Sequence, residues 1–200
     1  MCDSGARPRL DAPTASLPPA FYARPAPEVA RALIGMQLLV DGVGGNVVEA
    51  EAYDRDDPAS HSFNGQTVRN AAMFGPPGRA YVYRSYGLHW CLNVVCGTAP
   101  GSAVLIRALE PEHGLDLMRH RRGRVPDRDL CRGPGRLCQA LAITGSMNGW
   151  PLNTLPFTIL DKTAPTEVVT GPRIGITQGA GTLWRFGLAG SRFLSRPMQR

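Results

Sequence analysis

The segment at residues 47–53, with the sequence VVEAEAY, constrains the fold more than any other part of the chain. Side chains alternate between the two faces of a β-strand, so an extended segment places Glu49, Glu51 and Tyr53 on one face. The other face then carries small apolar side chains, which belong to Val48, Ala50 and Ala52. Carboxylates backed by small residues indicate a rigid strand at the floor of a cleft. The alternative is a half-buried strand whose acidic face is solvated.

Hydrophobic periodicity and turn residues predict short elements along the rest of the chain. Helices are expected at residues 27–34, 112–120 and 135–143, with one or two helical turns at 67–74. Strands are expected at residues 36–40, 79–84, 88–96, 103–109, 157–160, 168–170 and 183–188. Strands outnumber helices and do not alternate with them regularly. The sequence therefore predicts an α+β fold, a single domain with a curved, mainly antiparallel sheet, surrounding helices and a protruding β-hairpin.

Residues 79–96 carry the clearest hairpin signal. Two β-branched and aromatic runs flank the tight turn Ser85-Tyr86-Gly87, and turns of this kind join antiparallel strands. The hairpin would hold Tyr86 at its tip, where there is little core to bury an aromatic ring. Exposed aromatic side chains at loop tips usually contact a partner. Such a ring can enter the minor groove of DNA and fill the space left by an extruded base.

The composition of the chain limits the kinds of partner and the cellular compartment that we expect. The formal net charge of +6 and the pI near 9.4 favour a polyanionic partner, because counterion release drives such binding. No run approaches the roughly 18 apolar residues that a membrane span needs. Residues 1–19 are rich in proline and alanine and lack the apolar core of a signal peptide. We therefore expect a disordered arm at residues 1–19, a single domain at residues 20–200, and a soluble intracellular protein, in the cytoplasm or nucleoid if bacterial.

The five cysteines are an odd number and include no CxxC pair; they are Cys2, Cys91, Cys96, Cys131 and Cys138. Their spacings do not match the usual short pairs of zinc ligands, and no HxxxH or HExxH motif accompanies them. We expect reduced thiols that pack as small apolar side chains, and no metal.

Seven segments, in their order and spacing, resemble the alkyladenine (3-methyladenine) DNA glycosylase family. They are residues 49–53, 59–62, 66–70, 81–93, 105–111, 133–141 and 173–176. The resemblance implies a monofunctional purine DNA glycosylase of base excision repair, with residues 20–200 as its catalytic domain. Such an enzyme flips an alkylated or deaminated purine out of double-stranded DNA and hydrolyses its N-glycosyl bond, which leaves an abasic site. The implied substrates are 3-methyladenine, 7-methylguanine, hypoxanthine and ethenoadenine. We expect no cofactor, and we expect the protein to be a monomer.

The resemblance also assigns the catalytic residues. Glu51 matches the family's catalytic glutamate, which orients a water and takes its proton, while Glu49 is expected to be structural. Arg107 would help to hold the water and contact the DNA backbone, and the main-chain carbonyl of Ile176 would complete the coordination of the water. Two catalytic carboxylates, as in glycoside hydrolases, are disfavoured because residues two apart on one strand cannot flank a sugar. For Arg107, a structural salt bridge is the alternative.

A flipped base needs aromatic faces to stack on and polar groups that read its edge. By resemblance Tyr53 and Tyr83 are those faces, His61 stacks or donates from the wall, and Asn93 senses the purine 2-position. Tyr86 falls at the family's intercalating tyrosine. Further DNA contacts are implied for Thr67, Arg69, Met73 and Arg136. Each aromatic residue has an alternative role in the core or sheet.

The chain departs from the family pattern in three places. The segment between Tyr53 and His61 is about one residue shorter than usual. Arg84-Ser85 and His89-Trp90 replace apolar or smaller hairpin residues, and Gly135-Arg136 stands where a Ser-Lys pair is common. Two rival functions also remain open, a nucleosidase that acts on free nucleosides and a noncatalytic binder of damaged DNA or RNA.

Lysine usage adds an expectation about mechanism. Of the 22 Lys and Arg residues only Lys162 is a lysine, a skew that codon usage in a GC-rich genome would also produce. A glycosylase that also cleaves the DNA backbone needs an amine to form a Schiff base with the sugar. Only Lys162 or the chain terminus could supply one, and Lys162 lies outside the seven segments. We therefore expect no lyase activity.

Overall fold

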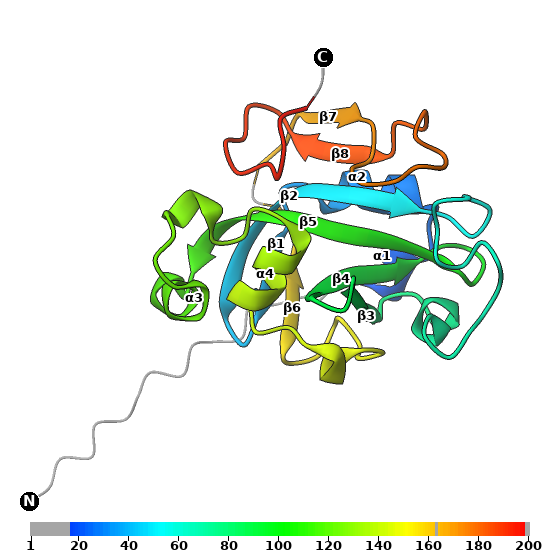
Figure 1. Cartoon of the computed structure of the whole chain (residues 1–200), viewed down its shortest axis with the longest axis horizontal. Helices are drawn as coiled ribbons and strands as arrows, with labels where there is room; N and C mark the ends of the chain where they lie inside the picture. The colour runs from blue at the N-terminus through cyan, green and yellow to red at the C-terminus, as the bar shows by residue number, and fades with distance from the viewer. Residues whose placement is uncertain (1–16, 163, 199–200) are drawn as a thin grey trace, which may run out of the picture.

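An eight-stranded sheet, in which every described pair of strands is antiparallel, forms the centre of the protein (Figure 1). The computed structural model describes residues 17–162 and 164–198. The strands are β1 (Gln37–Val40), β2 (Val43–Tyr53), β3 (Ala80–Ser85), β4 (His89–Cys96), β5 (Ser102–His113), β6 (Phe157–Leu160), β7 (Val168–Gly171) and β8 (Arg185–Leu188). They pair in the order β3-β4-β5-β2-β1-β6, and β8 joins β2 to β7. This is the predicted α+β fold with a curved antiparallel sheet.

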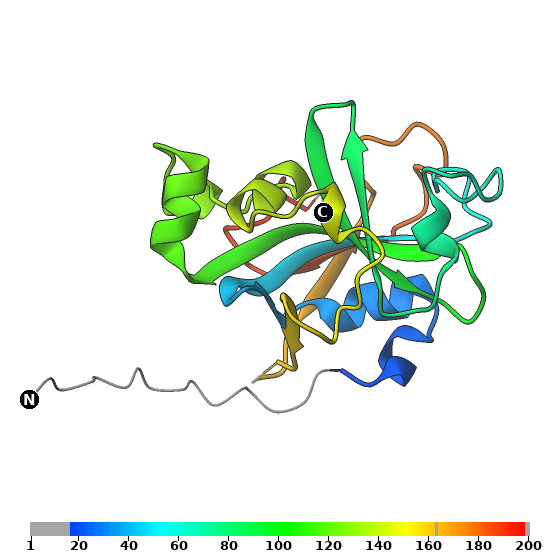
Figure 2. The same cartoon turned by 90° about the horizontal axis from the view of Figure 1, so that it is seen from below.

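Short helices lie on both faces of this sheet. They are α1 (Pro19–Tyr22), α2 (Ala26–Leu33), α3 (Leu115–Arg122) and α4 (Pro134–Ala140), with 3₁₀ turns η1 (Ala71–Phe74), η2 (Asp127–Asp129) and η3 (Gly145–Met147). The figures show α2 behind the sheet and α4 in front of it (Figures 1 and 2). Helix α2 turns an apolar stripe of period 3.6 toward the core, made of Ala26, Val29, Ala30 and Leu33. None of the described helices is long and apolar enough to cross a membrane.

Strand β2 is the element on which the site is built. One edge pairs with β5 along most of its length, while the other edge pairs first with β1 at residues 43–46 and then with β8 at residues 49–51. A β-bulge shifts the register against β5 between Val47 and Glu49. An extra residue reverses the face to which the following side chains point. Ala50 and Ala52 therefore join the main core as expected, whereas Val48 packs in a separate cluster with Phe193.

Two helix expectations need correction. The helix expected at residues 112–120 begins only at Leu115, because pairing with the glycines of β2 extends β5 to His113. Gly114, with a φ of 70°, separates strand from helix. Arg121 and Arg122 belong to the last turn of α3, beyond the predicted end of the helix at residue 120. Of the turns expected at residues 67–74, the structure shows η1 at residues 71–74.

The amino-terminal arm was expected at residues 1–19. Residues 1–16 lie outside the described part of the chain, Leu17 is buried and α1 begins at Pro19. Cys2 also lies outside it. The other four cysteines are free and buried, as expected for thiols that pack as apolar side chains.

Strands β3 and β4 form the expected hairpin, which rises beyond the rest of the sheet (Figure 2). Its tip is a turn in which Tyr86 and Gly87 both have positive φ, at 49° and 68°, the backbone signature of tight hairpin turns. Two glycines pack against β4 close to the tip of the hairpin. A Cβ atom at Gly135 would lie 2.8 Å from the Cβ of His89, and one at Gly145 would lie 2.6 Å from the ring of Trp90. The larger hairpin residues of this chain therefore fit because these two positions lack side chains.

Candidate active site

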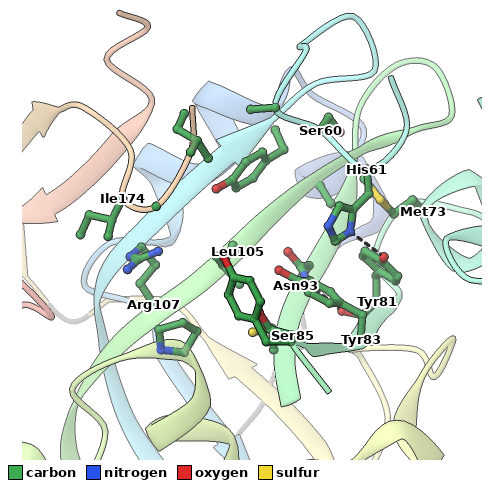
Figure 3. A pocket seen from close by; sticks show the side chains of 18 of the residues that line it. Ser60, His61, Met73, Tyr81, Tyr83, Ser85, Asn93, Leu105, Arg107 and Ile174 are labelled. Atoms are coloured by element: carbon green, nitrogen blue, oxygen red, sulfur yellow. Dashed lines mark hydrogen bonds between the residues drawn. The ribbon is translucent and has the colours of Figure 1, made fainter. Parts of the chain in front are cut away.

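A cavity of about 710 Å³ opens between the hairpin, the sheet and two loops. Most of the predicted site residues line it, namely Tyr53, His61, Arg69, Met73, Tyr83, Tyr86, Asn93, Arg107 and Ile176. Figure 3 shows Arg107 and Ile174 on one side of this pocket and His61, Met73, Tyr81 and Tyr83 on the other. The pocket is large enough for a drug-sized or nucleobase-sized ligand.

The hairpin side of the pocket is an aromatic wall. The rings of Tyr81 and Tyr83 stack with centroids 5.4 Å apart, and His61 meets Tyr83 edge-on at 4.6 Å. The Nδ1 atom of His61 is 2.9 Å from the hydroxyl of Tyr81. Burial raises the pKa of Tyr81 to about 12 and also raises that of Tyr83. Burial and the charge of Arg69 lower the pKa of His61. The whole wall is therefore uncharged at neutral pH.

Glu51 lies directly behind the opposite wall. Its side chain is fully buried, and its carboxylate accepts three hydrogen bonds. Oε2 accepts from the hydroxyl of Tyr53 at 2.9 Å and from a terminal nitrogen of Arg107 at 3.0 Å, and Oε1 accepts from the main-chain N–H of Ile174 at 2.7 Å. All three donors line the pocket. An ionised carboxylate has about four acceptor positions, so one position, on Oε1, is left for a further proton donor.

Tyr53 is held as a neutral donor. Burial, followed by the negative charge of Glu51, raises the pKa of its hydroxyl. Its ring lies 4.8 Å from the guanidinium of Arg173, which does not line the pocket.

Arg107 forms the structural salt bridges that were the alternative to its catalytic role, and it also lines the pocket. Its guanidinium lines the pocket and also joins the two buried carboxylates, with Nε 3.0 Å from Glu49 and NH1 3.0 Å from Glu51. Burial disfavours the charged guanidinium, but the charges of Glu51 and Glu49 outweigh this effect and raise the pKa of Arg107. Arg107 therefore stays cationic at the edge of the pocket.

Glu49 is surrounded by donors from distant parts of the chain. Oε1 accepts from Nε of Arg107 at 3.0 Å, from Nε of Arg185 at 2.8 Å and from the hydroxyl of Ser195 at 2.8 Å, while Oε2 accepts from the N–H of Ser195. Four donors surround the carboxylate, three of them on Oε1, and Glu49 does not line the pocket. This geometry favours the structural role over a paired-acid mechanism. Arg185 and Ser195 were missed by sequence reasoning, although Arg185, like Arg107, is a charge within an apolar strand.

Asn93 is fixed at the inner end of the pocket. It is buried, and its Nδ2 donates to the carbonyl of Tyr81 across the hairpin at 3.0 Å. Cys91 and Tyr81, which the sequence did not single out, line the pocket beside it.

The rim of the pocket is exposed and basic. Tyr86 is 90% exposed at the hairpin tip, and Arg69 donates to the carbonyl of Arg84 at 3.1 Å. Two predicted DNA contacts do not line the pocket. Thr67 accepts the N–H of Asn70 through its hydroxyl, and Arg136 is exposed on α4, next to the glycine that packs against the hairpin.

Comparisons with known proteins match one family over most of the chain. The family model for methylpurine-DNA glycosylase matches residues 20–192. A protein of Granulibacter bethesdensis is 59% identical over 190 residues, covering 93% of this chain and 90% of its own length. Proteins of Nitrosospira multiformis and Rhodopseudomonas palustris strain HaA2 are 61% and 60% identical over 174 and 180 residues, covering 86% and 90% of this chain and 90% of each relative. All three carry the name "Putative 3-methyladenine DNA glycosylase".

Proposed function

This chain belongs to the methylpurine-DNA glycosylase family, and from that premise we propose that it excises both alkylated and deaminated purines from duplex DNA by hydrolysis alone. As a DNA glycosylase it hydrolyses N-glycosyl bonds in DNA repair. The observation that carries the proposal is the Glu51 carboxylate, held by three pocket-lining donors directly behind an aromatic cavity.

Glu51 is the general base in this mechanism. Its spare acceptor position on Oε1 takes the proton of a water that attacks the anomeric carbon. As the N-glycosyl bond breaks, positive charge develops on the sugar and the negative charge of Glu51 stabilises it. Arg107 keeps Oε2 occupied and helps to hold the water, and the main-chain carbonyl of Ile176 completes the coordination of that water.

The uncharged aromatic wall of the pocket supports the proposed range of substrates. Purines alkylated as in 3-methyladenine and 7-methylguanine are cationic in DNA and leave readily. Neutral aromatic faces attract such cations, and the lowered pKa of His61 keeps that ring from repelling them. Hypoxanthine and ethenoadenine are neutral and depend more on stacking between Tyr53 and Tyr83.

Asn93 provides the discrimination against normal guanine. The bond from its Nδ2 to the carbonyl of Tyr81 prevents the amide from rotating away. The exocyclic 2-amino group of guanine would meet this fixed side chain. A site that rejects by steric and polar conflict needs no added contact to the correct base.

The two rival functions fit the geometry less well. A nucleosidase gains nothing from an aromatic side chain exposed at a hairpin tip or from a net charge of +6. A noncatalytic binder does not need a buried carboxylate that keeps one acceptor position in reserve. We also propose that the monomer is the active form.

The proposed reaction is tested on matched substrates. We expect base release from duplexes that carry a single 7-methylguanine or hypoxanthine, and none from inosine or from undamaged duplex. Borohydride should leave no protein joined to the DNA, because Lys162, which contacts Thr166 at 3.5 Å near the end of α2, does not line the pocket. Comparable release from inosine would favour a nucleosidase, and binding without release would favour a binder. A trapped adduct that disappears in Lys162→Ala would contradict hydrolysis alone.

Tyr86→Ala is expected to reduce excision from duplex DNA about 10-fold to 100-fold, because stacking on one base contributes about 1–3 kcal/mol. The ring is almost fully exposed, so its removal should leave the melting temperature unchanged. Tyr86→Phe keeps the ring and is the matched control. Single-turnover rates on duplex and single-stranded hypoxanthine substrates measure the effect. Equal duplex rates for the alanine variant and the wild type would exclude the wedge role.

A further inference from the structure

Arg173 lies immediately before the residue that hydrogen-bonds Glu51, yet the reaction described above does not use it. Its side chain is fully buried and makes a bidentate ion pair with Asp57, with NH2 3.0 Å from Oδ1 and NH1 bonded to Oδ2. NH1 also donates to the carbonyl of Ala52 at 2.9 Å, and NH2 to the carbonyl of Gly179 at 3.3 Å.

These bonds join three segments that carry residues of the site. Ala52 lies on β2 between Glu51 and Tyr53. Asp57 lies in the loop after β2, which carries His61 to the pocket wall. Arg173 itself begins the loop at residues 173–179, in which Ile174 donates its N–H to Oε1 of Glu51 at 2.7 Å.

The guanidinium also supports the stacking face. It lies 4.8 Å from the ring centroid of Tyr53 and 5.4 Å from that of Trp184. Tyr53 lines the pocket and Arg173 does not, so the guanidinium lies behind the ring. Arg173 thus contacts the ring that would stack on the base, and it adjoins Ile174, whose N–H binds Oε1 of Glu51.

A role in stability alone does not explain why the Arg173–Asp57 ion pair is buried beside the site. Buried ion pairs often contribute no more than well-packed apolar residues of similar volume. The Nε atom of Arg173 is buried and has no hydrogen-bond partner among the described residues, which adds a desolvation cost. Planar bidentate geometry, by contrast, fixes position and direction.

We propose that the Arg173–Asp57 ion pair is a positioning device for the hydrolytic step. It holds the N–H of Ile174 against Oε1 of Glu51 and the ring of Tyr53 in the stacking orientation. The inference rests on the proposed role of Glu51 as general base. When the pair is broken, the loop that follows Arg173 is free to shift, and a misplacement of about 1 Å costs about 100-fold in rate.

Asp57→Asn is the primary test, with Arg173→Lys as a second variant that keeps the charge but loses the planar fork. We expect single-turnover excision of hypoxanthine to fall about 10-fold to 100-fold. The Kd for duplex that carries an uncleavable abasic analogue should change by less than about threefold, because the rim and Tyr86 are untouched. Asp127→Asn is the matched control, since it removes a carboxylate from a bidentate pair with Arg119 on the exposed surface. It should leave the rate unchanged.

A double-mutant cycle separates positioning from general support. If Asp57 acts through Glu51, adding Asp57→Asn to Glu51→Gln should lower the residual rate less than about twofold, whereas independent effects add in free energy. Three results would each overturn the proposal. They are additive losses in the double variant, an excision rate of Asp57→Asn equal to that of Asp127→Asn, and weaker DNA binding by Asp57→Asn at an unchanged excision rate. Activity retained by Glu51→Gln alone would instead remove the proposed general base, so the two failures are distinguishable. Should Asp57→Asn not fold, Arg173→Lys enters the same cycle.

Discussion

Glu51→Gln is expected to lower the rate of base excision about 100-fold to 10,000-fold while damaged duplex still binds. The amide keeps the size of the side chain but cannot accept the proton of the attacking water. It also removes the negative charge that faces the developing cation on the sugar. Single-turnover release of hypoxanthine and titration of the same duplex measure the two quantities separately.

The hydrogen bonds of Glu51 also predict a loss of stability in the Glu51→Gln variant. Both carboxylate oxygens of Glu51 accept hydrogen bonds, whereas glutamine carries an NH₂ group in place of one of them. That NH₂ group must face either the N–H of Ile174 or the donors of Tyr53 and Arg107. A donor that faces a donor costs about 1–3 kcal/mol in a buried site, and the variant should melt earlier. The assay therefore has to be run where the variant is folded. Glu28→Gln, on the exposed side of α2, is the isosteric control. Near-normal turnover of folded Glu51→Gln would move the base to another residue.

The face of β2 on which most of its side chains lie could be predicted from the sequence, because it depends on the local alternation of side chains along an extended strand. Period two correctly placed Ala50 and Ala52 in the core and brought Glu51 next to Tyr53. The same rule gave the wrong packing for Val48, since the bulge beside it arises from pairing with β5, more than 50 residues away along the chain. A pattern of polar and apolar residues carries no signal for a bulge of this kind.

The basic composition of the chain does not show which arginines are available to bind DNA. The arginines at residues 119–124 contribute to the net positive charge that favours a polyanionic partner, yet three of them have partners within the fold. Arg119 pairs with Asp116 and Asp127, Arg121 donates to the carbonyl of Ala140, and Arg122 donates to that of Leu130. Whether an arginine is available to DNA depends on tertiary partners that local sequence does not reveal.

The Glu49 network shows the same limit at the site itself. Its donors Arg185 and Ser195 lie 136 and 146 residues from Glu49 along the chain. An isolated carboxylate in a strand gives no hint of which distant cations will surround it. Sequence reasoning could therefore assign Glu49 a structural role but could not say what it holds.

Glu49→Gln is expected to reduce the free energy of unfolding by about 3–5 kcal/mol, because removing one member of a buried ion network leaves an uncompensated charge. In the protein two buried carboxylates face two buried guanidinium groups. The variant leaves Arg107 and Arg185 with Glu51 alone. Chemical denaturation measures the loss, and a cost below about 0.5 kcal/mol, as for an exposed substitution such as Glu28→Gln, would contradict it.

The same variant should also slow excision, through Arg107 rather than through any proton transfer by Glu49. Arg107 is anchored at Nε by Glu49 and at NH1 by Glu51, and with the first anchor weakened its guanidinium is less well placed at the pocket. Removing Arg185 as well, in Glu49→Gln/Arg185→Gln, restores the charge balance, so part of the lost stability should return. The excision rate should not return with it, because Arg107 still lacks its second carboxylate. Recovery of both stability and rate in the double variant would show that Glu49 serves only to neutralise Arg185.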